Sequence, residues 1–320
     1  ATMLSVGDMW WDLVNADYDI PKGSKNLSIF CGNIWMGGLD GGGQLHVAAG
    51  TYRQSGIDFW PGPLDTISGG VIDSTCNDFD RFWKINRADV ESFVQNRHDP
   101  NYIIPEAILS WPGNGNTSRG VAHVLAPFND VDGDWIYDPM KGDYPMFTLG
   151  GQNDCEHNLL GDQAIWWVFN DKGNSHTETN GAPLGFEIQT TAFAYRSSND
   201  QLNDATFYRH KIINRSATMY HDMWFANWWD TDLGSYDDDY VGCDVARGMG
   251  YTYNGDSMDG WSITPMQGTY GLNPPAIGMD FLGGPQADGG DMVDNDHDLE
   301  IDEAGEHIAL ATSLYYVGDW

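Results

Sequence analysis

The chain has very few basic residues for its size. It contains 15 Lys and Arg against 47 Asp and Glu, so its formal net charge is -32. A surface with this charge repels nucleic acids and anionic lipids, because both present dense arrays of phosphate groups. We therefore expect no nucleic-acid partner.

Long hydrophobic runs are also missing. No stretch approaches the roughly 20 apolar residues that a transmembrane helix needs, so we expect no membrane insertion. Ala1 opens directly into mixed polar sequence with no signal-peptide pattern, which predicts either a cytosolic chain or an exported chain whose signal peptide has been removed. With 320 residues, 41% of them hydrophobic, we expect one large folded region over residues 1–320, with a possible subdivision near residues 150–160.

The four cysteines show no CxxC or CxxH spacing, which disfavours a zinc site. Three full disulfide pairings remain possible, and the sequence does not rank them. Cys76 and Cys155 lie in polar, loop-like surroundings and form the pair that we favour if a disulfide exists. Cys31 and Cys243 are predicted to be buried free thiols.

Common catalytic motifs are absent as well. The chain has no HExxH, GxSxG or P-loop motif, and its nine His are scattered singly. Only 8 Glu occur, and Glu178 and Glu187 flank a turn that contains Gly181 and Pro183. A glycosidase needs two carboxylates facing one cleft, so these two residues are the candidates for an alternative reading as a hydrolase.

Short strand-like runs recur between clusters of Gly, Asn, Asp and Pro, which is typical of an all-β protein. In the region from Thr206 to Ile213, successive side chains alternate as in a strand that has one more solvent-exposed face. A short helix is expected after Asn86, whereas the Gly-rich stretch from Gly37 to Gly43 is expected to form a turn or loop. The predicted strands are Leu45 to Tyr52, Ala164 to Phe169, Phe186 to Tyr195, Thr206 to Ile213, Met223 to Trp229 and Ile308 to Tyr316.

Three Trp-Trp doublets occur, at residues 10–11, 166–167 and 228–229. Adjacent residues of a strand point to opposite faces, so each doublet suits a sheet that is covered on both sides. Core packing is the first interpretation. An exposed indole that stacks on a sugar ring, or one that lies in a protein interface, is the alternative.

Aspartate is the dominant acid, with 39 Asp against 8 Glu, and it is clustered. Carboxylates at alternate loop positions are how proteins surround calcium. The strongest match places calcium-loop positions 1, 3, 5, 7 and 9 at Asp130, Asp132, Asp134, Ile136 (through its carbonyl) and Asp138. Lys141 stands where an EF-hand has its bidentate Glu, so Asp143 is predicted to replace that ligand or to support the site.

Two further acidic clusters are candidate calcium sites. The first repeats the alternate spacing, with Glu303 and Glu306 near the closing position, although His297 occupies the place that Gly133 has in the preceding loop. Its predicted ligands are Asp294, Asp296, Asp298, Glu300 and Asp302. The other cluster lacks the full spacing, but it is too dense to be buried without a cation or a raised pKa. Its predicted ligands are Asp230, Asp232 and Asp238.

Several stretches together resemble the amino-terminal region of large secreted Bacteroidota proteins that end in a type IX secretion sorting domain. They are residues 7–12 (GDMWWD), 34–40 (IWMGGLD), 51–54 (TYRQ), 58–63 (DFWPGP), 161–167 (GDQAIWW) and 239–244 (DYVGCD). The resemblance implies export through the outer membrane, removal of the signal peptide and display at the cell surface, but no reaction. No sorting domain is visible before Trp320, so we expect a part of a longer protein or a processed form.

These observations predict an all-β protein, an antiparallel β-sandwich with one or two short helices and long loops pinned by two or three structural calcium ions. The expected function is a non-enzymatic extracellular surface module for adhesion or for filament or sheath assembly. Its expected partners are other surface proteins, copies of itself or glycans. The alternative is a carbohydrate-active module, either a glycan-binding domain or a glycoside hydrolase.

Overall fold

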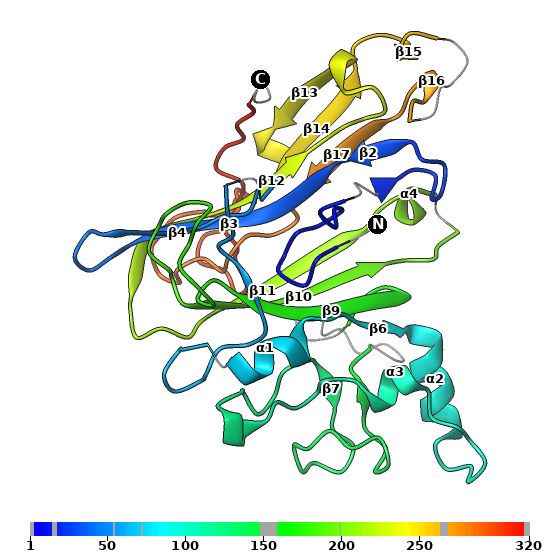
Figure 1. Ribbon diagram of the computed structural model, residues 1–320, viewed down its shortest axis with the longest axis vertical. Coiled ribbons are helices and arrows are strands. Elements are labelled where there is room, and N and C mark those ends of the chain that lie inside the picture. The colour runs from blue at the N-terminus through cyan, green and yellow to red at the C-terminus, as the bar shows by residue number, and fades with distance from the viewer. Residues whose placement is uncertain are drawn as a thin grey trace. The chain divides into compact units, whose positions relative to one another are not determined.

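The computed structural model describes residues 3–14, 18–53, 55–71, 73–147, 159–198, 200–262 and 268–316. Antiparallel strands dominate these residues, so the predicted all-β class is confirmed (Figure 1). The helices are α1 (Asp73–Phe79), α2 (Arg87–Asn96), α3 (Glu106–Leu109) and α4 (Asp200–Asn203), with 3-10 turns η1 (Thr117–Arg119), η2 (Tyr236–Asp238) and η3 (Val245–Arg247). In the described part of the chain, no helix is long and apolar enough to cross a membrane.

The strands are mostly short. They are β1 (Tyr18–Asp19), β2 (Leu27–Ile29), β3 (Cys31–Asp40), β4 (Leu45–Ala48), β5 (Trp60–Pro61), β6 (Trp83–Asn86), β7 (Phe128–Asn129), β8 (Tyr144–Pro145), β9 (Gln163–Asn170), β10 (Phe186–Ala194), β11 (Phe207–Asn214), β12 (Tyr220–Asp230), β13 (Asp239–Asp244), β14 (Met249–Asn254), β15 (Met258–Asp259), β16 (Gly271–Leu272) and β17 (Ala276–Asp280).

The chain divides into two compact units. The central unit contains Met3–Asp8 and Asn33–Trp228, and the terminal unit contains Met9–Gly32 and the chain from Trp229 onward. The boundaries between these units lie near residues 8, 32 and 228. The subdivision expected near residues 150–160 falls mostly outside the described residues and stays a prediction.

The central unit contains two facing sheets. One sheet has the order β11-β10-β9-β5, with β6 also paired to β9, and the other has the order β12-β3-β4. Ile34, Met36 and Ala48 of the smaller sheet share one apolar core with Trp167 and Ile188 of the larger sheet. This sheet-on-sheet packing is the sandwich arrangement.

The larger sheet is covered on its other face too. Trp166 packs with Ile85 of β6, Phe93 of α2 and Ile108 of α3 in a second core. In Figure 1, helices α1–α3 lie on one side of β9 and β10, and β3 and β4 lie on the other. Trp166 and Trp167 are both fully buried on opposite faces, so this doublet serves core packing.

Most predicted strands are present with shifted ends. The helix begins after Asn86 as expected, but the Asn86 side chain donates to Asp89 Oδ2 (2.9 Å) and does not cap the backbone. The Gly37–Gly43 prediction is wrong in its first half, because Gly37 and Gly38 lie inside β3. A Cβ at Gly38 would meet the sulfur of Met223, so a larger residue there would require the Met223 side chain to move.

The predicted strand from Ile308 to Tyr316 is absent. These residues have no strand partner, and most of them are exposed, so the alternating apolar pattern finds nothing to pack against. Residues 281–316, all described, contain no helix or strand, and Glu306 is their single buried residue. This segment of the terminal unit is therefore not ordered by an apolar core.

The cysteine predictions are met in part. Cys31 is buried in β3 as expected, but Cys243 is exposed on β13, because β13 is an edge strand of its sheet. Cys76 lies in α1 and is half-buried, not in a loop. Cys155 lies outside the described residues, so the Cys76–Cys155 pairing stays a prediction.

Candidate metal centres

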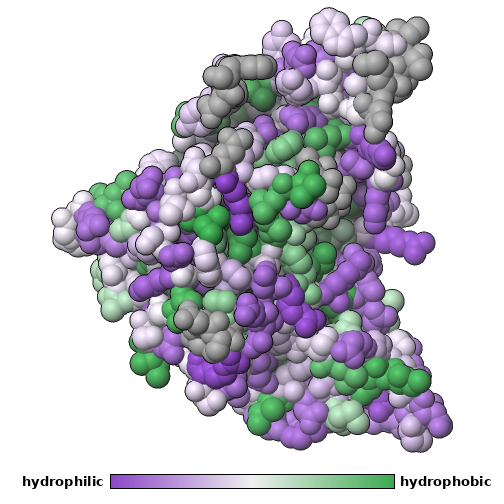
Figure 2. All heavy atoms as spheres, viewed as in Figure 1, coloured by the Kyte–Doolittle hydropathy of each residue, from purple (hydrophilic) through white to green (hydrophobic). Residues whose placement is uncertain are grey.

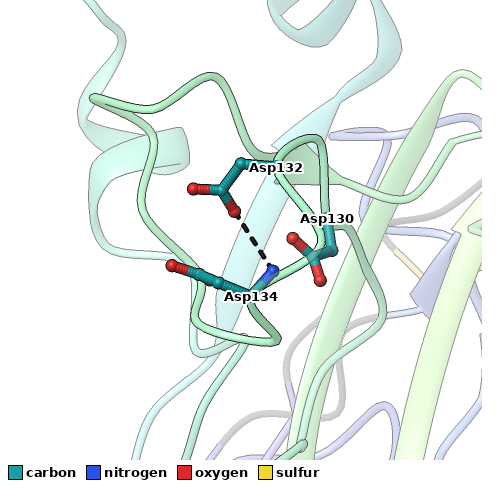
Figure 3. A group of neighbouring side chains, drawn as sticks. All are labelled: Asp130, Asp132 and Asp134. Atoms are coloured by element: carbon teal, nitrogen blue, oxygen red, sulfur yellow. Dashed lines mark hydrogen bonds between the residues drawn. The ribbon is translucent and has the colours of Figure 1, made fainter.

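The first acidic loop follows β7 and winds around its own carboxylates. Asp130, Asp132 and Asp134 each offer an oxygen, and these oxygens lie within 4.8 Å of one another (Figure 3). Asp130 accepts the N–H groups of Gly133 and Trp135, both at 2.8 Å. Such convergence of oxygens from alternate residues suits a hard cation.

The end of this loop is held by Asp143, which is fully buried. Its carboxylate accepts the N–H of Val131 (2.8 Å) and the N–H of Asp138 (2.9 Å), joining the two ends of the loop. Among the described residues, the group of converging side-chain oxygens does not include Asp138 or Asp143. The bonds of Asp143 hold the loop together, whereas its role at a metal and the carbonyl ligand of Ile136 stay predictions.

Lys141 supplies a tethered cation to the same loop. Its ammonium lies 3.1 Å from Asp132 and also bonds to the carboxylate of Asp134. Hydrogen bonds to Asp134 and then to Asp132 raise the pKa of Lys141 above its ordinary value. The ammonium therefore competes with any divalent cation for two of the three candidate ligands.

Replacing Lys141 should strengthen divalent binding at this loop. In Lys141→Gln the competing charge is removed while most of the side-chain length remains, so we expect several-fold tighter calcium binding. Isothermal titration calorimetry measures the change. Lys84→Gln, which removes an exposed lysine of β6, is the control, and equal affinities in both variants would contradict the competition.

The second acidic loop has two overlapping groups of converging carboxylates. Asp294 and Asp296 lie with Glu306, while Asp296 and Asp298 lie with Glu303, again with oxygens within 4.8 Å. The exposed Glu300 lies outside both groups, and Asp302 accepts the N–H groups of residues 290–292 at 2.6, 3.0 and 3.2 Å. Among the described residues, Glu303 and Glu306 thus supply the carboxylates that complete the two groups at the end of the loop.

The two loops share one backbone pattern although they belong to different units. In both, the first Asp accepts an N–H five residues on, at 2.8 Å for Trp135 and 3.1 Å for Leu299. Both loops take positive φ at equivalent positions, 77° for Gly133 and 61° for Trp135, then 65° for His297 and 83° for Leu299. His297 thus adopts the left-handed conformation that glycine favours, and each such non-glycine residue costs about 1–2 kcal/mol. A bound cation would offset this strain.

Glu303 is the residue of this loop whose charge is least compensated. A hydrogen bond from its own backbone lowers its pKa, but burial and the charges of Glu306, Asp298 and Asp296 together raise the pKa above the ordinary value. Its Oε2 atom is buried without a hydrogen-bond partner. Glu306 is buried as well and accepts the N–H of Asn295 at 2.5 Å. A cation beside these carboxylates would satisfy the orphan oxygen.

The third predicted cluster is arranged differently. Among the residues that the structure describes, Asp230, Asp232 and Asp238 do not form a converging group. Burial and the charge of Asp230 raise the pKa of Asp232 to about 6. Asp239, which the sequence analysis did not name as a ligand, is the more perturbed residue.

Burial raises the pKa of Asp239 to about 7, helped by the charges of Asp238, Asp259 and Asp232 and opposed by a hydrogen bond from Leu233 N–H. The Oδ1 atoms of Asp238 and Asp239 are buried and have no hydrogen-bond partner. Asp259, which comes from β15 and is 1% exposed, accepts the N–H of Ser235 at 2.7 Å. Only folding brings Asp259 to this cluster, so spacing in the sequence gave no signal for it.

The raised pKa of Asp239 predicts a pH dependence in calcium-free buffer. The folded pKa of about 7 lies above the ordinary value of 3.8, so folding favours the protonated form. The stability from this group is fully present below about pH 4 and is lost as the pH rises through 7. Asp239→Asn stays neutral and should lose less stability between pH 5 and pH 8 in urea unfolding with chelator. Equal losses in both proteins would contradict the raised pKa.

The alternative pair of Glu178 and Glu187 is not joined by any hydrogen bond among the described residues. Glu187 is fully buried, and its carboxylate accepts two bonds from Arg215 (3.1 and 3.0 Å) and one from Leu64 N–H (3.1 Å). Glu178 is half-buried and accepts the hydroxyl proton of Thr51. These bonds hold the Glu187 carboxylate in the core, and the hydrolase role of Glu178 and Glu187 stays an alternative prediction.

A small polar cavity of the central unit lies beside Glu178, because the lining residue Asp58 accepts the Glu178 N–H at 3.0 Å. It is lined by Asp8, Asn33, Arg53 and Asp58, among others, and its volume of about 10 Å³ gives room for about one water molecule. Such a cavity does not accommodate a sugar ring.

No protein-family model, curated protein or solved structure matches the chain. Function therefore has to be inferred from the residues themselves.

Proposed function

We propose that this chain is a calcium-stabilised extracellular surface module that acts in adhesion or in filament or sheath assembly. The observation that carries the proposal is the pair of acidic loops, in two separate units, whose carboxylates converge and whose backbones follow one pattern. A shared ligand explains why unrelated segments of the chain adopt the same strained geometry. The all-oxygen ligand set favours calcium over softer metals.

The segment after β17 adds a second argument. Residues 283–316 contain nine acidic residues and no Lys or Arg, and Glu306 is their single buried residue. Repulsion among these carboxylates and the entropy of ordering the loop both oppose the observed conformation. Bound calcium would neutralise the charge and hold the backbone, which suits a protein exposed to proteases outside the cell.

The location at the cell surface comes from the resemblance to type IX secretion substrates. On the face shown in Figure 2, hydrophilic residues are interspersed with smaller hydrophobic patches. Assembly would bring this module against copies of itself or against other surface proteins. The second candidate function is glycan binding, which the exposed Tyr240 and Tyr253 on neighbouring strands favour.

Calcium titration by calorimetry tests the proposal. The full chain should bind at least two calcium ions, and Asp132→Asn and Asp296→Asn should each remove or strongly weaken one site. Asp222→Asn is the matched control, because Asp222 is an exposed aspartate whose hydrogen-bond partner is His221 and which lies outside the loops. Absence of binding, or equal binding by all four proteins, would overturn the proposal. Sedimentation with and without calcium then reports whether the module assembles.

Calcium should also protect residues 283–316 from proteolysis. In chelator we expect rapid cleavage within this segment, because its backbone has few other constraints. Asp296→Asn should be cleaved quickly even with calcium, since Asp296 belongs to both converging groups. Mass spectrometry of the fragments locates the cuts. Cleavage that is equally slow with and without calcium would show that the segment is held by other contacts.

A further inference from the structure

Three tyrosines form a row on one face of the sheet β13-β14-β17 in the terminal unit. Tyr240 pairs with Tyr253, which pairs with Ala276, and Gly242 pairs with Tyr251, which pairs with Gly278. Residues directly opposite each other in antiparallel strands share a face. Tyr240, Tyr251 and Tyr253 therefore lie together among small residues; we call them the tyrosine face.

The three rings are neighbours whose planes are moderately inclined to one another. Tyr240 and Tyr253 have centroids 6.0 Å apart with planes inclined by 25°, and Tyr251 and Tyr253 have centroids 6.1 Å apart and planes inclined by 34°. The Tyr251 ring covers Gly242, where a Cβ would approach its Cζ to 2.5 Å. Tyr240 is 60% exposed and Tyr253 is 43% exposed. Tyr240 and Tyr253 are thus exposed neighbours on the sheet, and the half-buried Tyr251 adjoins them.

The charges around this face restrict what it can bind. Asp244 and Asp280 lie at one end of the same face, both in register with Met249. Arg247, which follows β13, is already paired with Asp244 at 3.0 Å. With carboxylates at the rim and a net charge of -32, the face repels polyanions, so nucleic-acid bases and acidic polysaccharides are disfavoured although they could stack.

The size of the face argues against a stable protein interface. A fully buried aromatic side chain contributes roughly 150–250 Å², so three partly exposed rings supply well under the roughly 800 Å² per partner of a standard interface. Small residues (Gly242, Gly278 and Ala276) lie among the tyrosines on this face. A narrow aromatic strip with carboxylates at one end is better matched to an extended chain than to a globular partner.

We propose that the tyrosine face binds a neutral polysaccharide chain by stacking its sugar rings on Tyr240, Tyr253 and Tyr251. The C–H face of a pyranose is apolar and weakly positive, and it meets the negative face of an aromatic ring. Sugar hydroxyls at the edges would bond to the phenolic hydroxyls and to the carboxylates of Asp244 and Asp280. This inference rests on the proposed adhesive function, for which it names the partner.

Affinity electrophoresis in calcium buffer tests the inference. The full chain is run through gels containing soluble neutral polysaccharides (a β-glucan, a xylan and a mannan) or anionic polygalacturonate. We expect retardation by at least one neutral polymer and none by polygalacturonate. Tyr240→Ala and Tyr253→Ala should weaken binding roughly tenfold each, in line with losses of other stacking contacts, whereas Tyr253→Phe should keep most of it.

Tyr236→Ala is the matched control, because Tyr236 is also 60% exposed but lies in η2, outside the sheet. Retardation that is unchanged in Tyr240→Ala and Tyr253→Ala, or absent for every neutral polymer, would overturn the inference. Self-association that these variants abolish would also overturn it, since a second copy would then be the occupant. Calcium binding without glycan binding rejects this inference alone, and glycan binding without calcium binding rejects the proposed calcium loops alone.

Discussion

Removal of calcium is expected to lower the free energy of unfolding by about 5 kcal/mol. A ligand present at 100 times its dissociation constant stabilises the folded state by about 2.7 kcal/mol per site, and two converging acidic loops imply two sites. For units of this size each kcal/mol shifts the melting temperature by about 2–4 °C. Because each unit holds one loop and so loses about 2.7 kcal/mol, chelation should lower the melting temperature of each unit by roughly 5–10 °C, as scanning calorimetry measures.

Magnesium is the control for this prediction. It requires near-ideal octahedral geometry and dehydrates reluctantly, so flexible loops rich in carboxylates should respond to it much less than to calcium. The unit that contains the first loop and the unit that contains the second loop should both lose stability. Equal melting curves in calcium and in chelator would contradict structural calcium and would mean that the acidic loops are solvated turns.

Breaking the ion pair of Glu187 and Arg215 is expected to destabilise the central unit by about 3–5 kcal/mol. Glu187 is completely buried on β10, and Arg215 is 18% exposed. In Arg215→Met the carboxylate loses two charge-assisted hydrogen bonds and stays in the core without a countercharge. Urea unfolding of the variant measures the loss.

Arg119→Met is the matched control, because Arg119 pairs with Asp78 at the surface, where both side chains are at least 34% exposed. Such exposed pairs contribute about 0–1 kcal/mol. The double variant Arg215→Met with Glu187→Gln should recover part of the stability, since it removes the uncompensated charge. A loss in Arg215→Met no larger than in Arg119→Met would mean that Glu187 is not held by this pair and is available for other chemistry.

The strands of the large sheet could be predicted because their apolar runs are long and are bounded by turn residues. Trp166 and Trp167 signalled a sheet with two covered faces, as observed. The segment from Ile308 to Tyr316 carried the same kind of pattern, but a strand needs a partner that local sequence does not supply. β3 was not predicted because it contains Gly37 and Gly38, and the packing of Gly38 against Met223 involves a strand distant in the sequence.

The alternate spacing predicted the converging aspartates at the start of each loop. They are Asp130, Asp132 and Asp134 in the first loop and Asp294, Asp296 and Asp298 in the second. The spacing did not rank the closing residues, because Glu303 and Glu306 reach the second loop only through the fold of its far end. The pairing of Lys141 with Asp132 and Asp134 also depends on loop conformation. For the tyrosine face a signal existed: Tyr251-Thr252-Tyr253 alternates aromatic and polar residues as a two-faced strand does.

The most direct test of structural calcium is an anomalous difference map from crystals of the full chain grown with calcium. The account predicts one peak among Asp130, Asp132 and Asp134 and at least one among Asp294, Asp296, Asp298, Glu303 and Glu306, each surrounded by carboxylate oxygens at about 2.3–2.6 Å. Two well-ordered loops with no anomalous peak at either would contradict structural calcium. The common backbone conformation of the two loops would then form without a cation.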